Sequence, residues 1–225
     1  MENNKKIALL VGATGLIGNH CLHFLLEDAN YSSVVALVRK KIPVEHPKLK
    51  QHVINFEKLQ ESASLLKADD VFCCLGTTIK QAGSQAAFKK VDSEYPVAVA
   101  QLSQQQGAKQ FLLVTAMGAN KSSLVFYNRV KGEVEEAVKQ IPFLTIHIFQ
   151  PSLLLGDRAE KRAGEKASAF FFNLTAPLFV GPFKKYKAIE GRAVAGAMVK
   201  CANKNSTGIF IHESNEIQKI YDKKN

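Results

Sequence analysis

The chain has 225 residues, of which 46% are hydrophobic and 22% are charged, and its formal net charge at pH 7 is +10. A chain of this length and composition can bury one large core, which excludes a wholly disordered, collagen-like or coiled-coil protein. The positive charge favours an anionic partner, and a phosphorylated cofactor, nucleic acid or an acidic membrane surface would each satisfy it.

Apolar strand-like runs alternate with helical patterns along the chain. The predicted strands are Ile7–Val11, Val34–Val38, Gln51–Ile54, Asp70–Leu75, Phe111–Val114, Phe143–Phe149 and Ile209–His212. The predicted helices are Gly15–Asp28, Asp92–Gln106 (capped by Asp92 and stopped by Gly107) and Ser122–Gln140, stopped by Pro142. This alternation predicts an α/β fold with a doubly wound parallel sheet, a Rossmann fold, in a single domain over residues 1–225. Residues 156–192 interrupt the alternation and are interpreted as a substrate-side insertion.

The N-terminus, the cysteines and the histidines indicate in which cellular compartment the protein is expected. Residues 1–10 lack a small-residue cleavage site, so no signal peptide is predicted, and the longest uncharged stretch, residues 167–183, is too short and proline-interrupted for a transmembrane segment. No disulfide framework or metal-ligand spacing is apparent among Cys21, Cys73, Cys74, Cys201, His20, His23, His46, His52, His147 and His212. The sequence therefore predicts a cytoplasmic protein with reduced thiols and no metal site.

A glycine-rich turn, V-G-A-T-G-L-I-G over residues 11–18, joins the first predicted strand to the first predicted helix. Glycines permit a tight turn that a pyrophosphate can approach closely, and the helix N-terminus offers it free N–H groups and a partial positive charge. Such a turn can also serve only close helix–strand packing, but its place between strand and helix favours dinucleotide binding. The candidate contacts are Gly12, Thr14, Gly15, Leu16, Ile17 and Gly18.

Two cations follow the second predicted strand. An acidic residue there would bind the ribose hydroxyls of NAD, whereas this chain has Arg39 and Lys40. Cationic side chains form strong charge-assisted hydrogen bonds with a 2′-phosphate. A solvated basic loop is the alternative, because Lys41 continues the run. The pair predicts NADP as the cofactor.

Tyr127 and Lys131 lie four residues apart in a predicted helix, so both side chains project from one face. A cation beside a phenol favours the phenolate, and the phenol can then move a proton to or from an oxygen during hydride transfer. Thr115, just after the fifth predicted strand, is a candidate to orient a substrate carbonyl. Spacing alone favours an ordinary surface pair on an amphipathic helix.

Seven segments spread over most of the chain carry a family resemblance. They are V-G-A-T-G-L-I-G (11–18), A-L-V-R-K (36–40), F-C-C-L-G-T-T (72–78), G-A-N-K-S-S (118–123), Y-N-R-V-K-G-E-V-E (127–135), P-S-L-L-L-G-D-R (151–158) and Y-K-A-I-E-G-R-A-V-A (186–195). In this order they resemble the atypical, extended-like short-chain dehydrogenase/reductase superfamily. Within it, the chain looks most like the oxidoreductases related to the HIV Tat-interacting protein.

The resemblance implies an NADP-dependent oxidoreductase that transfers a hydride to or from a small carbonyl or alcohol substrate. It implies Tyr127 as the general acid/base and Lys131 as the residue that holds the nicotinamide ribose. Further cofactor contacts are implied at Asn55 and Phe56 beside adenine, at Leu75, Gly76 and Thr77 beside the ribose and nicotinamide, and at Pro151, Ser152 and Leu153 near the carboxamide.

Four positions depart from the family pattern. Thr115 and Ala116 stand where serines are usual, Asn55 stands for Asp, and Gln150 stands where Arg commonly precedes the proline. Thr keeps the hydroxyl of Ser but is stiffer at χ1. The fourth catalytic residue of better-known short-chain enzymes, an Asn, has no assigned counterpart.

Two other function classes stay open at this stage. One is an NADP-binding regulator or scaffold without turnover, which would bind protein partners. The other is a nucleic-acid binder, although the basic residues are scattered and no helix-turn-helix, zinc or aromatic–basic RNA motif occurs, so no specific nucleic acid is predicted. The phenylalanines between residues 170 and 183 would form an apolar substrate wall, a partner surface or ordinary core.

Overall fold

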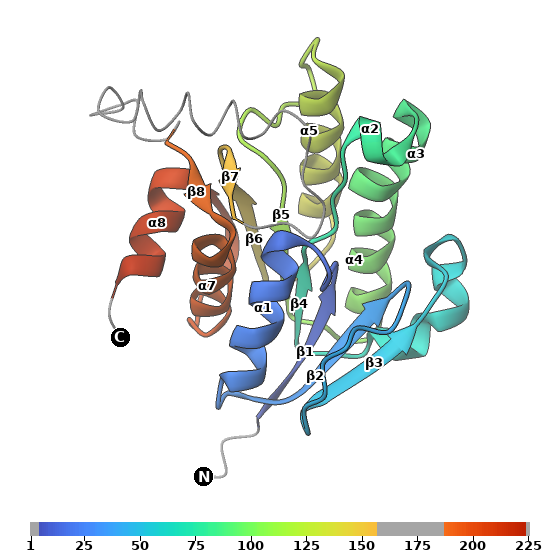
Figure 1. The fold of residues 1–225 in the computed structure, drawn as a ribbon, viewed down its shortest axis with the longest axis vertical. Helices are drawn as coiled ribbons and strands as arrows, with labels where there is room; N and C mark the ends of the chain where they lie inside the picture. Colours follow the sequence, from blue (N-terminus) through green and yellow to red (C-terminus); the bar gives the residue numbers. More distant parts are fainter. Residues whose placement is uncertain (1–4, 157–186, 224–225) are drawn as a thin grey trace.

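The protein folds into a parallel sheet with helices on both faces (Figure 1). The structure is a computed structural model that describes residues 5–156 and 187–223. The strand order is β3-β2-β1-β4-β5-β6-β9, and every neighbouring pair is parallel. The strands are β1 (Lys6–Val11), β2 (Tyr31–Val38), β3 (Leu49–Val53), β4 (Asp70–Cys73), β5 (Gln110–Val114), β6 (Thr145–Gln150) and β9 (Gly208–Glu213). The seven predicted strands and the doubly wound α/β fold are confirmed.

The helices form two layers, with α1, α7 and α8 over one face of the sheet and η1, α4 and α5 over the other (Figure 1). Their bounds are α1 (Leu16–Glu27), η1 (Phe56–Leu66), α2 (Ile79–Ala82), α3 (Gln85–Lys89), η2 (Lys90–Glu94), α4 (Tyr95–Gln105), α5 (Phe126–Lys139), α7 (Gly191–Ala202) and α8 (Ser214–Asp222). Within residues 5–156 and 187–223, none of these helices has the length and apolar character needed to cross a membrane.

The central strand β1 shows why the sheet is buried on both faces. Ala8 and Leu10 pack into the core beneath α1 and α7, whereas Leu9 and Val11 pack into the core beneath α4 and α5. All four side chains are fully buried. Side chains alternate across a strand, so a continuous apolar run supplies both cores at once.

The sheet reverses its winding between β1 and β4, which are neighbours although β2 and β3 continue on one side and β5 and β6 on the other. A crevice at the carboxyl ends of the strands is expected at such a switch point. The loops after β1, β4 and β5 carry the glycine turn, Gly76 and Thr115, so three of the predicted site segments meet at this edge.

Several predicted boundaries differ from the structure, and three of them bear on the site. Asp92 does not cap a helix, because it lies inside the π-helical segment η2 and α4 begins only at Tyr95. The helix predicted from Ser122 begins at Phe126, because the Asn120 side chain accepts a hydrogen bond from the Ser122 N–H (2.8 Å) and holds this stretch in turns. Strand β4 ends at Cys73 rather than at Leu75.

The predicted insertion over residues 156–192 falls largely outside the described residues, and so do the phenylalanines between residues 170 and 183. At its two ends the chain forms a short parallel pair of strands, β7 (Leu154–Leu155) with β8 (Ile189–Glu190). A Cβ on Gly156 would lie 2.7 Å from the Leu16 Cδ1, and one on Gly191 would lie 2.6 Å from the Leu16 Cγ. Both ends of the segment therefore lie against Leu16 in the first turn of α1.

Candidate functional site

The glycine turn has the geometry that close approach of backbone requires. Gly12 adopts φ +84°, and a Cβ there would lie 2.5 Å from the Cys74 carbonyl carbon, while one on Gly18 would lie 2.0 Å from the Gly12 oxygen. These two glycines therefore let β1, the loop after β4 and α1 pack together. Packing thus accounts for Gly12 and Gly18 but leaves the purpose of the middle glycine open.

The middle of the turn faces outward and fits a phosphate. Thr14 and Gly15 are exposed, and among residues 5–156 and 187–223 a Cβ on Gly15 would meet only two carbonyl oxygens, at 3.3 and 4.0 Å. Gly15 is the N-cap of α1 and makes no side-chain capping hydrogen bond, so the N–H groups at the start of the helix are open to an anion. The side chain of Leu16 is partly buried and that of Ile17 is buried, so those residues would contribute backbone.

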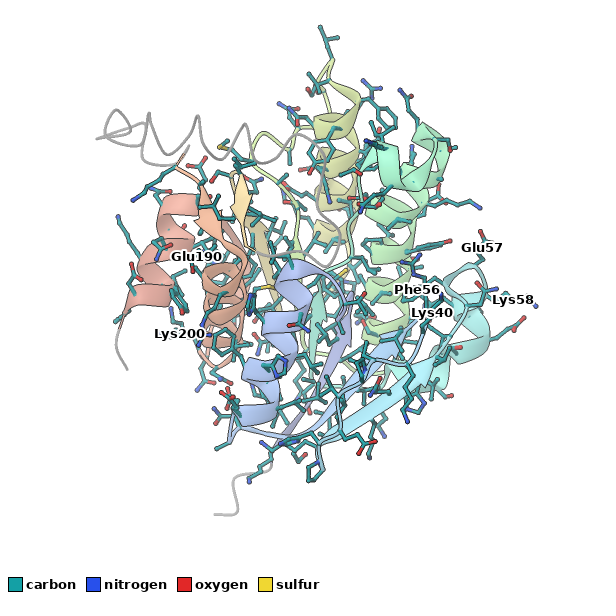
Figure 2. All side chains as sticks on the ribbon, viewed as in Figure 1. Lys40, Phe56, Glu57, Lys58, Glu190 and Lys200 are labelled. Atoms are coloured by element: carbon teal, nitrogen blue, oxygen red, sulfur yellow. The ribbon has the colours of Figure 1, made fainter. Side chains whose placement is uncertain are left out.

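Arg39 and Lys40 follow β2 directly, and both are exposed. Lys40 and Phe56 lie where β2 ends and η1 begins, as Figure 2 shows. The Asn55 side chain accepts a hydrogen bond from the Glu57 N–H (3.0 Å) as the cap of η1, and Phe56 packs in the core with its ring centroid 5.7 Å from that of Tyr95. Of these four predicted contacts, Arg39, Lys40 and Asn55 are exposed, whereas Phe56 is buried.

A buried ion pair lies at the carboxyl end of β4. The Lys131 Nζ is 2.7 Å from the Asp92 Oδ1, and the two side chains are 5% and 1% exposed. The other oxygen of Asp92 accepts a hydrogen bond from the Thr77 N–H (2.9 Å), and a Cβ on Gly76 would lie 3.9 Å from the Lys131 Nζ. Asp92 therefore ties the loop after β4 to the lysine of α5.

Charge at Lys131 is maintained despite burial. Burial alone would lower the pKa of Lys131, but the Asp92 carboxylate and the Tyr127 phenol act in the opposite direction, and the pKa is raised overall. The lysine is thus a fixed cation within reach of the phenol. Sequence spacing put Tyr127 and Lys131 on one face, and the structure places that face toward the sheet rather than toward solvent.

Tyr127 lies half-buried in the first turn of α5, with its ring centroid 5.5 Å from that of the fully buried Phe88. The helix approaches the preceding loop very closely, since a Cβ on Gly132 would lie 2.1 Å from the Lys121 N. Gly132 therefore fixes where α5 sits and, with it, the height of Tyr127 and Lys131 above the sheet.

Thr115 is buried and its hydroxyl already has a partner. The Thr115 Oγ1 lies 2.6 Å from the Glu135 Oε1, and the Gln150 amide donates to both oxygens of that carboxylate at 3.0 Å. Burial raises the pKa of Glu135, an effect that the hydrogen bonds from Thr115 and Gln150 partly oppose. With Glu135 ionised, the Thr115 proton is directed at the carboxylate rather than at a substrate.

The residues after β6 serve the fold in the described structure. Pro151 and Ser152 are buried, and the Met117 N–H donates to the Pro151 oxygen (2.9 Å). The Ser152 N–H donates to the Ser214 Oγ (2.6 Å), and the Leu153 oxygen accepts from the Ile189 N–H (2.9 Å). They connect the end of β6 to β8 and α8 at the carboxyl edge of the sheet.

Asp92 and Glu135 are the two acidic residues that sequence reasoning missed. Asp92 had been interpreted as a helix cap, and Glu135 had no assigned role. The signal for Glu135 was its spacing, because Tyr127, Lys131 and Glu135 repeat every four residues on α5 and therefore share a face. No local pattern links Asp92 to Lys131, because the two meet only through the fold.

Comparisons with known proteins agree with this geometry. Residues 12–163 match the family model described as NAD(P)H-binding. Protein HTATIP2 of Rattus norvegicus is 40% identical over 176 residues, which cover 76% of this chain and 72% of that protein. Protein fmp52, mitochondrial, of Aspergillus clavatus is 32% identical over 206 residues, covering 88% of each chain.

Solved structures show the same fold. Bordetella bronchiseptica WbmH in complex with NAD+ has a TM-score of 0.71 at 15% identity, covering 97% of this chain and 80% of that one. UDP-glucose 4-epimerase from Thermotoga maritima has a TM-score of 0.67 at 16% identity, covering 97% and 84%. At these identities the likeness shows the architecture alone.

The comparisons correct one prediction and confirm another. The expectation of a cytoplasmic protein is contradicted by the fungal relatives, since FMP52 proteins of several species are named mitochondrial. The resemblance stated from the motifs is confirmed, and the nicotinamide cofactor is supported at the level of NAD(P)H. The chain belongs to the NAD(P)H-binding family of Rossmann-fold proteins, with HTATIP2 and FMP52 proteins among its relatives.

Proposed function

We propose that this protein is an NADP-dependent oxidoreductase in which Tyr127 is the general acid/base for a small carbonyl or alcohol substrate. The observation that carries the proposal is the arrangement on α5: Tyr127 stands one turn before Lys131, and Lys131 is a buried cation paired with Asp92 at 2.7 Å. A buried ion pair is costly to desolvate, so its presence beside the crevice indicates a role other than stability alone.

The proposed step is a proton transfer coupled to reduction. A bound nicotinamide would supply the hydride for the carbonyl carbon, or accept it in the reverse direction. As the carbonyl bond opens, negative charge grows on the substrate oxygen, and the Tyr127 hydroxyl donates its proton to that atom. Lys131 stabilises the phenolate that remains, because an opposite charge at close range favours the ionised form.

Asp92 has a positioning role in this proposal. It holds the Lys131 ammonium from one side and the Thr77 N–H from the other, so the lysine and the loop after β4 keep one geometry. Burial in neutral surroundings would lower the pKa of the lysine and favour its uncharged form, whereas the nearby Asp92 carboxylate favours the charged form. The loop at Leu75, Gly76 and Thr77 would pass beside the ribose and nicotinamide.

The cofactor is proposed to rest its diphosphate on the turn from Gly12 to Gly18 and its 2′-phosphate on Arg39 and Lys40. The open N–H groups at the start of α1 and the exposure of both cations support this placement. The substrate side is proposed to be formed by residues 156–192, since both ends of that segment reach Leu16 beside the turn.

Replacement of the phenol tests the proposal. Tyr127→Phe keeps the ring against Phe88 and removes only the proton donor, so NADPH binding, followed by nucleotide fluorescence, should stay within a few-fold of wild type. Turnover on a panel of aldehydes, ketones and quinones should fall by about 10²- to 10⁴-fold. Equal turnover in the two proteins would remove Tyr127 from the mechanism.

A nucleotide-dependent binding protein without turnover is the second candidate. It is favoured by one observation, the hydrogen bond that directs the Thr115 hydroxyl to Glu135 rather than outward (2.6 Å). In that case NADPH would bind while no carbonyl in the panel oxidised it, and a protein partner would be retained only by the nucleotide-loaded form.

A further inference from the structure

A second cluster of ligand-type side chains lies away from the crevice, beneath the edge strand β9. It consists of His147 in β6, His212 in β9 and Cys201 near the end of α7, and the three residues are 3%, 5% and 1% exposed. The candidate nucleotide site makes no use of them. Because β6 and β9 form the end of the sheet opposite β3, the cluster is several strands away from the glycine turn.

The ligand atoms have a spacing that suits one ion. The His147 Nδ1 and the His212 Nε2 are 3.0 Å apart, and one ligand atom from each of the three residues lies within 4.8 Å of the others. Two nitrogens bound to one tetrahedral zinc ion at 2.0–2.1 Å would lie roughly 3.3 Å apart. Metal entry therefore needs only small side-chain shifts.

The outward nitrogen of each ring lies near a polar side-chain atom. The His212 Nδ1 lies 3.1 Å from a Glu216 carboxylate oxygen, and the His147 Nε2 lies 3.4 Å from the Ser206 Oγ. Metal-ligating histidines commonly donate their second ring N–H to a carboxylate or another acceptor, which fixes the tautomer. The nitrogens left over are the two that face each other.

Burial keeps His147 and Cys201 uncharged in the metal-free protein. Burial, with smaller contributions from His212 and Lys204, lowers the pKa of His147 to about 4, so its ring is neutral at pH 7. Burial likewise raises the pKa of the Cys201 thiol to about 11, so the metal-free thiol holds its proton. The charged groups facing the cluster are Lys204 and Glu216, one of each sign.

We propose that His147, His212 and Cys201 form a binding site for a borderline-soft transition metal ion, with Zn²⁺ the best match to two imidazoles and one thiolate. Hard cations such as Mg²⁺ and Ca²⁺ prefer oxygen ligands and do not suit this set. Water completes a fourth position in this assignment. The ion would join β6, the edge strand β9 and α7, which gives it a stabilising role.

Binding balances as a proton exchange. The Cys201 thiol loses its proton to solvent as the sulfur–metal bond forms. His212 keeps its proton on Nδ1 toward Glu216 and binds through Nε2, while His147 moves its proton from Nδ1 to Nε2, toward Ser206. One proton is released for each ion bound, and the bound complex has a charge of +1.

Cobalt spectroscopy on the full-length, chelator-treated protein tests the site. One equivalent of Co²⁺ should produce a thiolate-to-cobalt charge-transfer band and the intense visible bands of a four-coordinate ion. Both should disappear in Cys201→Ser and in His147→Asn. The matched control is Cys21→Ser, which alters another buried helical cysteine on the same face of the sheet, and its spectrum should equal that of wild type.

Zinc affinity and melting temperature give a second measurement, which holds even if a ligand variant folds poorly. Glu216→Gln changes a half-exposed side chain and should weaken zinc binding by about 10- to 100-fold without loss of the fold. Zinc should raise the melting temperature of wild type and Cys21→Ser but not of Cys201→Ser. The proposal is overturned if wild type binds no stoichiometric Zn²⁺ or Co²⁺, or if the ligand variants bind as wild type does.

Discussion

The two halves of the candidate site are built in different ways. The proposed nucleotide half is made from short local segments, the turn Gly12–Gly18 and the cations after β2, and it offers backbone N–H groups and exposed charge. The proposed catalytic half joins Asp92 in η2, Lys131 in α5 and the loop after β4, and it contains a buried ion pair. Backbone chemistry needs only a local motif, whereas a buried charge needs a partner supplied by the fold.

Removing the partner of Lys131 should have the largest effect on stability. Asp92→Ala leaves a cation buried without its carboxylate, and the free energy of unfolding should fall by about 3–5 kcal/mol in a denaturant titration. The matched control is Glu133→Ala, which breaks the much more exposed pair with Lys89 (3.0 Å) and should cost about 1 kcal/mol or less. Equal losses of unfolding free energy in the two variants would contradict the view that the buried Asp92–Lys131 pair differs from an exposed ion pair.

Substitution in the glycine turn should disrupt cofactor binding by steric overlap with neighbouring backbone rather than by a change of charge. Gly12→Ala places a Cβ 2.5 Å from the backbone of Cys74, in addition to the strain of φ +84°, so we expect loss of NADPH binding together with reduced stability. Gly107→Ala is the control, because Gly107 has φ +94° but no heavy atom within 4 Å of a Cβ. Calorimetric titration with NADPH should separate the two variants; similar behaviour would mean that backbone strain, not close approach, limits the turn.

The two exposed cations should affect cofactor choice alone. Replacing either Arg39 or Lys40 with Ala should weaken NADPH binding by about 10- to 100-fold, since a charged hydrogen bond contributes about 1.5–3 kcal/mol, and should leave NADH binding nearly unchanged. The unfolding free energy should not move, because both side chains are exposed. A parallel loss for NADH, or a wild-type preference for NADH, would show that the pair is a solvated loop.

The smallest effect is expected in the pH dependence of stability. The pKa of Glu135 is raised in the folded protein, chiefly by burial, so the folded state holds this proton more tightly than the unfolded chain does. Its stabilising contribution is therefore present below the ordinary glutamate pKa and is lost as pH rises through the raised value. Glu135→Gln should make the fall in unfolding free energy from pH 4 to pH 8 less steep. An unchanged slope would mean that the pH dependence comes from Asp70, whose pKa is also raised.

Several features of the fold were predictable because they repeat locally. The seven strands follow from apolar runs, and the turn follows from glycines placed between a strand and a helix. Helices α7 and α8 were not predicted. Ten of the twelve residues of α7 are buried, and the two that are not are Arg192 and Lys200. Apolar residues therefore surround the helix, and its amphipathic periodicity is weak. A helix of this kind is identified from its tertiary packing rather than from its sequence pattern.

Sequence by itself determined the order of the strands, the glycine turn and the face shared by Tyr127 and Lys131, because each depends on residues within a few positions of one another. Only the tertiary structure decided that Asp92 pairs with Lys131, that Glu135 accepts from Thr115, and that two histidines and a cysteine from three elements meet. The physical reason is that burial and distance set the energy of a charge or a hydrogen bond, and both are fixed only when remote segments pack.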